Sequence, residues 1–359
     1  MSADASAAAE RPGILLTGAT GFFGSFLLDT LLEMTEGTVY CLVRATDDRH
    51  ARTRVRQNLL RYHRWRPEVA DRLAAIAGDL AQPRLGLDST KYERIASQVT
   101  TIYHNGAIVN HMLPLSHLAA ANVDGTRALT QLAAHGMSKK LVHMSANAVI
   151  DGYATGYVES KRQAENVIRD AVADGVCGSV YRLPRLAPDS RGGQPNENDA
   201  MIRLVEIILA VGTAPETRIA EDWVSADVAA RAIVAAGARA ACGDVYTLVA
   251  DEPVVLPYLL AAATDAGFDI PVEPLPDWVA RVKALRSTEY DVTLGLLGLD
   301  GTDVADPDSG APVDGADRGT PLVAERITRA ALTRYFARCR AGFDGARQPY
   351  SPFIGTPQS

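Results

Sequence analysis

The chain has 359 residues, of which 47% are hydrophobic and 22% are charged, and its formal net charge is -7. This length allows one large domain with a smaller one attached, and the composition is ordinary for a globular protein. The acidic balance argues against broad nucleic-acid binding, and no apolar run is long enough to predict a membrane span.

Residues 1–12 lack the basic start and apolar core of a signal peptide, so we expect a flexible leader. The four cysteines show neither metal-ligand nor redox spacing along the chain. They are therefore expected to be reduced, packed thiols of a cytoplasmic protein. These cysteines are Cys41, Cys177, Cys242 and Cys339.

From Gly13 onward, short β-rich runs alternate with amphipathic helical segments, a pattern typical of βαβ units. We expect an α/β fold with a doubly wound parallel Rossmann sheet and a smaller, mostly helical C-terminal substrate lobe. The predicted strands are 14–17, 38–43, 73–77, 99–104, 141–144, 179–183 and 245–249. The predicted helices are 23–33, 52–62, 115–135, 157–173, 201–211 and a last one near 321–341.

These elements predict an NADP-binding Rossmann domain over residues 13–256, with 185–222 contributing to the substrate lobe. A C-terminal substrate-binding lobe is expected over 257–345, followed by a flexible tail over 346–359. The stretch 298–319 is rich in Gly and Asp, which predicts a mobile loop.

A glycine-rich turn over residues 17–24 follows the first strand and opens the first helix. Its Gly-x-x-Gly-x-x-Gly spacing permits a tight turn, close approach of a pyrophosphate and close packing of helix on strand. The helix N-terminus also attracts the anion, so the turn predicts a dinucleotide site. Its candidate binding residues are Gly18, Thr20, Gly21, Phe22, Phe23 and Gly24.

The end of the second strand indicates which dinucleotide is used. Arg44 stands where an NAD enzyme would place an acid, and a guanidinium suits a 2′-phosphate, so NADPH is the expected cofactor. Arg54 is a second candidate for that phosphate. The other arginines nearby are expected mainly on a solvated surface, with CoA phosphates or an acidic carrier protein as alternative partners. This basic stretch contains Arg49, Arg52, Arg54, Arg56, Arg61, Arg64 and Arg66.

Further cofactor-binding residues are expected in loops that follow strands, where binding residues concentrate. The candidates are Asp79 and Leu80 after the third strand, Asn105, Gly106 and Ala107 after the fourth, and Pro184 after the sixth.

Tyr157 and Lys161 form a Tyr-x-x-x-Lys pair, and residues four apart share one face of a helix. Hydride transfer to a carbonyl carbon must be matched by a proton to its oxygen, and a nearby ammonium is expected to lower the pKa of the phenol. Lys161 can also hold the nicotinamide ribose. Ser145 is the candidate hydroxyl that bonds the reacting oxygen. Asn122 is either a residue that holds the helix and a water near the lysine, or an ordinary polar residue of a helix.

With these residues the chain resembles the thioester reductase domains that end nonribosomal peptide and polyketide assembly lines, within the extended short-chain dehydrogenase/reductase superfamily. Carboxylic acid and fatty acyl-CoA reductases are related to them. The resemblance extends over residues 13–249. It rests on residues 17–24, 42–44, 78–80, 83–87, 103–110, 122–126 and 157–161, and more weakly on 196–199 and 223–231.

The resemblance implies NADPH-dependent reduction of an acyl thioester to a hemithioacetal, which collapses to an aldehyde, with reduction onward to an alcohol as an option. The implied partners are an acyl or peptidyl carrier protein bearing a phosphopantetheine thioester, or an acyl-CoA. No carrier or adenylation domain precedes residue 13, so we expect a stand-alone enzyme acting in trans in a biosynthetic pathway.

The chain departs from this family at the end of the fifth strand. Members usually carry the catalytic hydroxyl where Ala146 stands, and whether Ser145 replaces it stays open. The interval of twelve residues from Ser145 to Tyr157 is also short for the family.

Two alternatives remain. The first is other extended short-chain dehydrogenase chemistry, by a ketone reductase or a nucleotide-sugar epimerase or dehydratase, which Arg44 and the block around His104 oppose. The second is a redox-inactive relative, either a thioester cyclase or a cofactor-sensing binding protein. Ala146 motivates this alternative, and retention of Tyr157 and Lys161 argues against it.

Overall fold

The computed structural model describes residues 12–151, 154–300 and 317–345, and the chain divides into two compact units. Of the described residues, the first unit comprises 12–151, 154–183, 230–248 and 317–322, and the second comprises 184–229, 249–300 and 323–345. The predicted leader, apart from Pro12, the predicted tail and most of the predicted loop over 298–319 lie outside the described residues.

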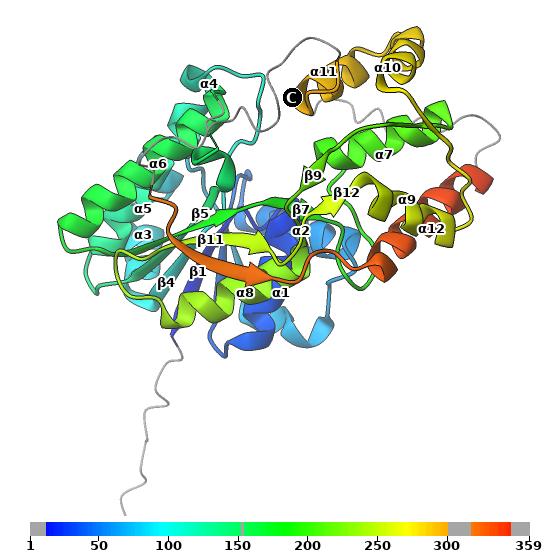
Figure 1. Cartoon of the computed structure of the whole chain (residues 1–359). Coiled ribbons are helices and arrows are strands. Elements are labelled where there is room, and N and C mark those ends of the chain that lie inside the picture. The colour runs from blue at the N-terminus through cyan, green and yellow to red at the C-terminus, as the bar shows by residue number, and fades with distance from the viewer. Residues whose placement is uncertain (1–11, 152–153, 301–316, 346–359) are drawn as a thin grey trace, which may run out of the picture. The chain divides into compact units, whose positions relative to one another are not determined.

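The first unit is built on an eight-stranded sheet with the strand order β14-β11-β6-β5-β4-β1-β2-β3 (Figure 1). The order reverses between β1 and β4, which pair in parallel, and such a reversal is where doubly wound sheets bind ligands. The predicted Rossmann sheet and its seven strands are confirmed. The strands are β1 (Gly13–Thr17), β2 (Val39–Val43), β3 (Leu73–Ala77), β4 (Val99–His104), β5 (Lys140–Ala146), β6 (Cys177–Leu183), β11 (Val245–Ala250) and β14 (Thr320–Ala324).

Helices cover both faces of this sheet. Apolar side chains of the strands, such as Leu15 and Leu141, share a buried cluster with Ile95, Leu129 and Ile168 of α3, α5 and α6. Figure 1 shows those three helices along one face and α1 and α8 along the other. The helices are α1 (Phe22–Met34), α2 (Asp48–Arg61), α3 (Ser89–Gln98), α4 (Leu115–Ala119), α5 (Gly125–Ala134), α6 (Gly156–Ala173) and α8 (Ala226–Arg239).

The prediction of a single α-helix over residues 115–135 is wrong in one respect. A π-helical turn, η3 (Ala120–Asp124), separates α4 from α5. Asn122 lies in this turn, and its buried side-chain amide bonds the backbone of Ile108 instead of facing solvent. Wide turns of this kind are frequent at functional sites.

The helix predicted to begin near residue 321 is also wrong at its start. Thr320–Ala324 forms β14 at the edge of the sheet, and α12 begins only at Arg329. An edge strand tolerates Pro321, because its missing N–H need not join a ladder on the open side.

The expectation that all four cysteines are reduced is contradicted, because Cys177 and Cys242 form a disulfide. Cys177 begins β6, and Cys242 lies in the turn before β11, which pairs with β6 in parallel. Adjacent strands thus bring together two residues that are 65 positions apart in the sequence. Cys41 and Cys339 remain free, the first buried and the second partly buried.

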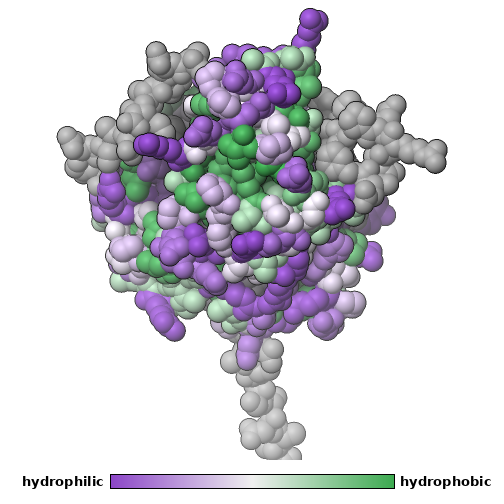
Figure 2. Space-filling view, turned by 45° about the vertical axis from the view of Figure 1, so that its right-hand side comes forward, coloured by the Kyte–Doolittle hydropathy of each residue, from purple (hydrophilic) through white to green (hydrophobic). Residues whose placement is uncertain are grey.

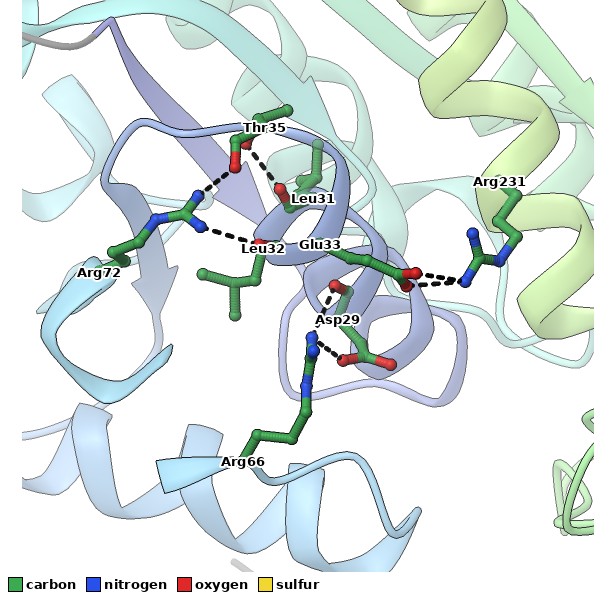
Figure 3. Close-up of polar contacts among 8 residues, drawn as sticks. All are labelled: Asp29, Leu31, Leu32, Glu33, Thr35, Arg66, Arg72 and Arg231. Carbon is green, nitrogen blue, oxygen red and sulfur yellow. Dashed lines mark hydrogen bonds and ion pairs between the residues drawn. The ribbon is translucent and has the colours of Figure 1, made fainter. Parts of the chain in front are cut away.

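The C-terminal end of α1 is held by Arg72 (Figure 3). Its guanidinium donates to the carbonyl oxygens of Leu32 (2.9 Å) and Thr35 (2.5 Å). The last carbonyls of a helix lack intrahelical partners and carry partial negative charge, so a cation at this position satisfies and stabilises them.

Part of the basic stretch also packs on α1. Arg66 pairs with Asp29 at 2.7 Å (Figure 3), and the guanidinium of Arg64 lies 4.9 Å from the ring centroid of Phe26. Arg52, by contrast, is exposed. The arginines of this stretch therefore divide into residues that join α1 to its surroundings and residues on the surface.

The second unit is mostly helical and has a core of its own. Trp223, Trp278 and Phe336 are at most 1% exposed within it. Its strand pairs are β7 (Arg185–Ala187) with β10 (Trp223–Ser225), β8 (Ala214–Pro215) with β13 (Val272–Glu273), and β9 (Ala220–Glu221) with β12 (Val254–Val255). Its helices are α7 (Ala200–Val211), α9 (Leu256–Asp265), α10 (Leu275–Ala284), α11 (Thr288–Leu296) and α12 (Arg329–Gly345).

The described surface is of mixed polarity. On the face that Figure 2 shows, polar side chains cover most of the surface, and apolar side chains gather near its centre. Among the described residues, no helix combines the length and the apolar character that crossing a bilayer requires.

Candidate functional site

The three glycines of the turn after β1 have different roles. Gly18 has a φ of +75°, a conformation that side chains rarely adopt. A Cβ on Gly24 would lie 1.9 Å from the carbonyl oxygen of Gly18, so close packing of α1 on β1 requires glycine there. A Cβ on Gly21 would meet only that same oxygen, at an ordinary 3.4 Å. The fold therefore requires the first and third glycines and leaves open space beside the second, where a pyrophosphate fits.

Gly21 is also the N-cap residue of α1 and has no side chain to cap the helix. The first N–H groups of α1, including those of Phe22 and Phe23, are thus left for an anion, with the positive end of the helix dipole behind them. Asn58 of α2 holds the turn in place, because its amide donates to the carbonyls of Ala19 (3.0 Å) and Gly21 (2.9 Å). No sequence motif indicated this role for Asn58.

Arg44 follows β2 with an exposed side chain, and its carbonyl accepts a hydrogen bond from the guanidinium of Arg54. The next two acids in the sequence are already engaged. Asp47 caps the first turn of α2, and Asp48 pairs with Lys91 at 2.8 Å. The end of β2 thus presents the exposed guanidinium of Arg44, which fits a phosphate better than a ribose hydroxyl.

The loop after β4 is joined to the glycine turn. The N–H of Gly106 donates to the hydroxyl of Thr17 (2.8 Å), and the Asn105 amide lies 3.5 Å from the carbonyl oxygen of Gly18. A Cβ on Gly106 would come within 2.7 Å of Leu80. Four of the predicted cofactor residues, Gly18, Leu80, Asn105 and Gly106, thus lie together at the carboxyl edge of the sheet.

The other predicted residues are less closely grouped. Thr20, in the turn itself, is partly buried, as is Ala107, which directly follows Gly106. Asp79 accepts a bond from its neighbour Ala81 (2.9 Å) and so shapes its own loop. Pro184 belongs to the second unit, whereas the glycine turn belongs to the first. Its role in cofactor binding stays a prediction.

A buried hydrogen-bond chain runs through the ring of His104. Thr126 donates to the carbonyl of Asn122 (2.6 Å), so it accepts from Nε2 of His104 at 2.9 Å. Burial lowers the pKa of His104 to about 3, so the ring is neutral, and with its proton on Nε2 it has a lone pair on Nδ1. That lone pair accepts from the hydroxyl of Thr17 at 2.9 Å, while Thr17 itself accepts from the N–H of Gly106.

Tyr157 and Lys161 lie in the first two turns of α6 and share one face of that helix, as the sequence predicted. Lys161 is 4% exposed, and its ammonium donates to the carbonyl of Met144 at 2.5 Å. Ser145, next along β5, is also buried, and its hydroxyl has no hydrogen-bond partner among the residues that the structure describes. Its assignment as the third catalytic group stays a prediction.

The ionisation of the pair differs from the sequence-based expectation. The pKa of Tyr157 is not lowered by the lysine; burial raises it to about 12. The ammonium of Lys161 donates to the backbone carbonyl of Met144. Burial also lowers the pKa of Lys161 to about 8, partly offset by Glu165, so the ammonium stays mainly charged at neutral pH.

Asn122 joins the loop after β4 to α6. Its side-chain Oδ1 accepts from the N–H of Ile108 (2.7 Å), and its side-chain amide donates to the carbonyl of Ile108 (3.0 Å) and to the hydroxyl of Ser160 (2.9 Å). Ser160 in turn donates to the carbonyl of Tyr157 (2.7 Å). The structure therefore favours a positioning role for Asn122 over that of an ordinary helix residue.

Comparison with known proteins identifies one matching family model and several similar proteins. The family model described as Male sterility protein matches residues 16–156 and 148–233. A linear gramicidin synthase protein of Brevibacillus parabrevis is 33% identical over 75% of this chain, and the large subunit of L-2-aminoadipate reductase from Candida glabrata is 27% identical over 87%. The chain spans only 6% and 26% of the lengths of these two relatives.

A solved structure with the same architecture is the terminal R domain from the myxalamid PKS-NRPS biosynthetic pathway. It has 28% sequence identity and a TM-score of 0.80, covering 94% of this chain and 92% of that one.

The different roles of the glycines predict different effects of substitution. Gly21→Ala should have nearly the wild-type free energy of unfolding, because the added Cβ meets only an ordinary contact. It should weaken dinucleotide binding about tenfold or more, because the Cβ fills the open space beside the turn. Gly24→Ala should instead cost several kcal/mol of stability through the clash at 1.9 Å. Urea unfolding and fluorescence titration with NADPH separate the two effects. Wild-type NADPH affinity in Gly21→Ala would contradict the assignment.

The buried histidines predict a loss of stability in acid. Burial lowers the pKa of His143 in the folded protein well below its usual value. In the unfolded protein, His143 therefore binds a proton at a pH where it stays neutral in the folded protein. Stability is thus complete above about pH 6.5 and falls below it, by about 2 kcal/mol per such histidine at pH 5. Between pH 7 and pH 5, the free energy of unfolding of His143→Phe, measured with urea, should therefore decrease by about 2 kcal/mol less than that of the wild type. The exposed His117→Phe is the control, and an equal slope in His143→Phe would contradict the prediction.

Proposed function

Since the chain belongs to the Male sterility protein family, we propose that it is an NADPH-dependent reductase that converts an acyl thioester into an aldehyde. The observation that carries this proposal is the Tyr157 and Lys161 pair in the same unit as the glycine turn. An acid group that can protonate a carbonyl oxygen thus belongs to the domain that binds the dinucleotide.

Bound NADPH would supply a hydride to the thioester carbon. Tyr157 gives its proton to the carbonyl oxygen as the hydride arrives, which forms a hemithioacetal. Lys161, charged at neutral pH, stabilises the negative charge that the phenol acquires. Collapse of the hemithioacetal releases a thiol and the aldehyde, and a second cycle on the aldehyde gives the alcohol.

The proposed substrate carries its acyl group on a phosphopantetheine arm, belonging either to a carrier protein or to CoA. The relatives support this choice, since one is part of linear gramicidin synthase and another domain belongs to a PKS-NRPS pathway. The proposal includes action in trans, on an acyl group carried by a separate molecule.

An assay with a separate thioester tests this function. Wild-type protein with NADPH and an acyl-CoA or acyl-pantetheine should oxidise NADPH and yield an aldehyde or alcohol, identified by mass spectrometry. Tyr157→Phe keeps the ring but removes the proton, and should lower kcat by about 100-fold or more. The control is Tyr246→Phe, a partly buried tyrosine of β11. Thioester turnover without NADPH oxidation would instead favour a cyclase, and activity only on nucleotide sugars would favour an epimerase.

The choice of cofactor is tested at Arg44. Arg44→Ala should raise the KM for NADPH by about tenfold or more and leave the KM for NADH nearly unchanged, because only NADPH carries the 2′-phosphate. Arg52→Ala removes an exposed arginine of α2 and serves as the matched control. Equal changes in the two KM values would overturn the assignment of NADPH.

A further inference from the structure

His111 lies in the loop between β4 and α4, between two fixed points. On one side, Asn122 makes two hydrogen bonds with the backbone of Ile108. On the other side, the N–H groups of Met112 (2.8 Å) and Leu113 (3.1 Å) donate to the side-chain Oδ1 of Asn110. The loop is thus tied to η3 and to its own backbone on both sides of His111.

The ring of His111 meets the ring of Tyr157 edge to face. Their centroids are 5.0 Å apart and their planes make an angle of 67°. Nδ1 of His111 also lies 3.5 Å from the hydroxyl of Thr155, the N-cap of α6. That hydroxyl also accepts from the N–H of Val158 (3.2 Å), and it can donate its own proton to Nδ1 when the neutral ring carries its proton on Nε2.

Exposure distinguishes His111 from the other ionisable groups near Tyr157. Lys161 is buried and bonded to Met144, whereas Tyr157 is partly buried and His111 is exposed. His104 and His143 are fully buried, and burial holds them neutral. The ring of His111 therefore contacts the ring of Tyr157 and is also exposed to solvent. Imidazole is the side chain that ordinarily changes charge between pH 5 and 8.

From this geometry we propose that His111 is a proton-relay residue, which returns a proton from solvent to Tyr157 after each reduction. The inference rests on the function proposed above. In the reduction, Tyr157 loses its proton to the carbonyl oxygen and becomes a phenolate. The His111 imidazolium gives a proton to that phenolate, and the neutral ring then takes one from water. One proton is consumed from solvent for each hydride transferred, which balances the conversion of thioester to aldehyde and thiol.

His111→Phe is the informative variant, because it keeps an aromatic ring against Tyr157 but cannot carry a proton. The first turnover uses the proton already on Tyr157, so the pre-steady-state burst of NADPH oxidation should keep its wild-type rate. Later turnovers need the relay, so kcat should fall about tenfold or more. Wild-type kcat should also decline as pH rises past neutrality, and this dependence should be lost in the variant. Added imidazole should restore kcat in part.

The matched control is His117→Phe, an exposed histidine of α4, which should behave as wild type in each measurement. A purely structural role for His111 would lower the burst and kcat together and would not respond to imidazole, and this result would overturn the relay. Wild-type kcat and pH profile in His111→Phe would overturn it as well. The proposed function fails separately, if the wild-type protein itself does not oxidise NADPH with a thioester.

Discussion

The carboxyl edge of the sheet depends on the hydrogen-bond chain that runs from Thr17 through His104 to Thr126. Each of the three residues comes from a different element, β1, β4 or α5, so the chain fixes these elements against one another. Thr17 also accepts from Gly106, which extends the chain into the loop after β4. A protonated His104 has no lone pair for the Thr17 hydroxyl, so this arrangement exists only while the ring is neutral.

A second junction continues from the first. Thr126 donates to the carbonyl of Asn122, whose side chain bonds the backbone of Ile108 and the hydroxyl of Ser160. The π-helical turn places Asn122 where one amide can satisfy both the loop after β4 and the helix that carries Tyr157. The glycine turn, the loop after β4 and α6 are thus joined in one continuous polar network. A displacement of any member leaves a buried polar group unsatisfied, which costs about 1–3 kcal/mol.

Most of the fold could be predicted from the sequence, because buried parallel strands are continuous apolar runs and the glycine spacing identifies the first βα turn. The resemblance to terminal reductase domains was likewise visible in short motifs, and the comparisons confirm it. What could not be predicted depends on contacts between distant residues. The disulfide between Cys177 and Cys242 requires knowing that β11 lies beside β6, and the strand at Pro321 requires knowing that the sheet has an open edge there.

The site shows the same limit. Local spacing was enough to place Tyr157 and Lys161 on one helix face, but not to show that the ammonium is directed at Met144. The contribution of Asn58 to the glycine turn had no signal at all, since its two acceptors lie more than thirty positions earlier in the chain. The pKa of the phenol depends on such directions and on burial, and neither is a property of sequence spacing.

The distribution of charge in this region follows from the cost of burying ions. Lys161, His104 and His143 are all buried, and burial first and the lysine charge second lower the pKa of both histidines. Only one of the three has an anionic group that favours its charged form, since Glu165 raises the pKa of Lys161. Glu165 itself is held by Arg182 at 2.7 Å. The buried cluster therefore carries its positive charge on the lysine and keeps the histidines neutral, which is the state that the hydrogen bonds of His104 require.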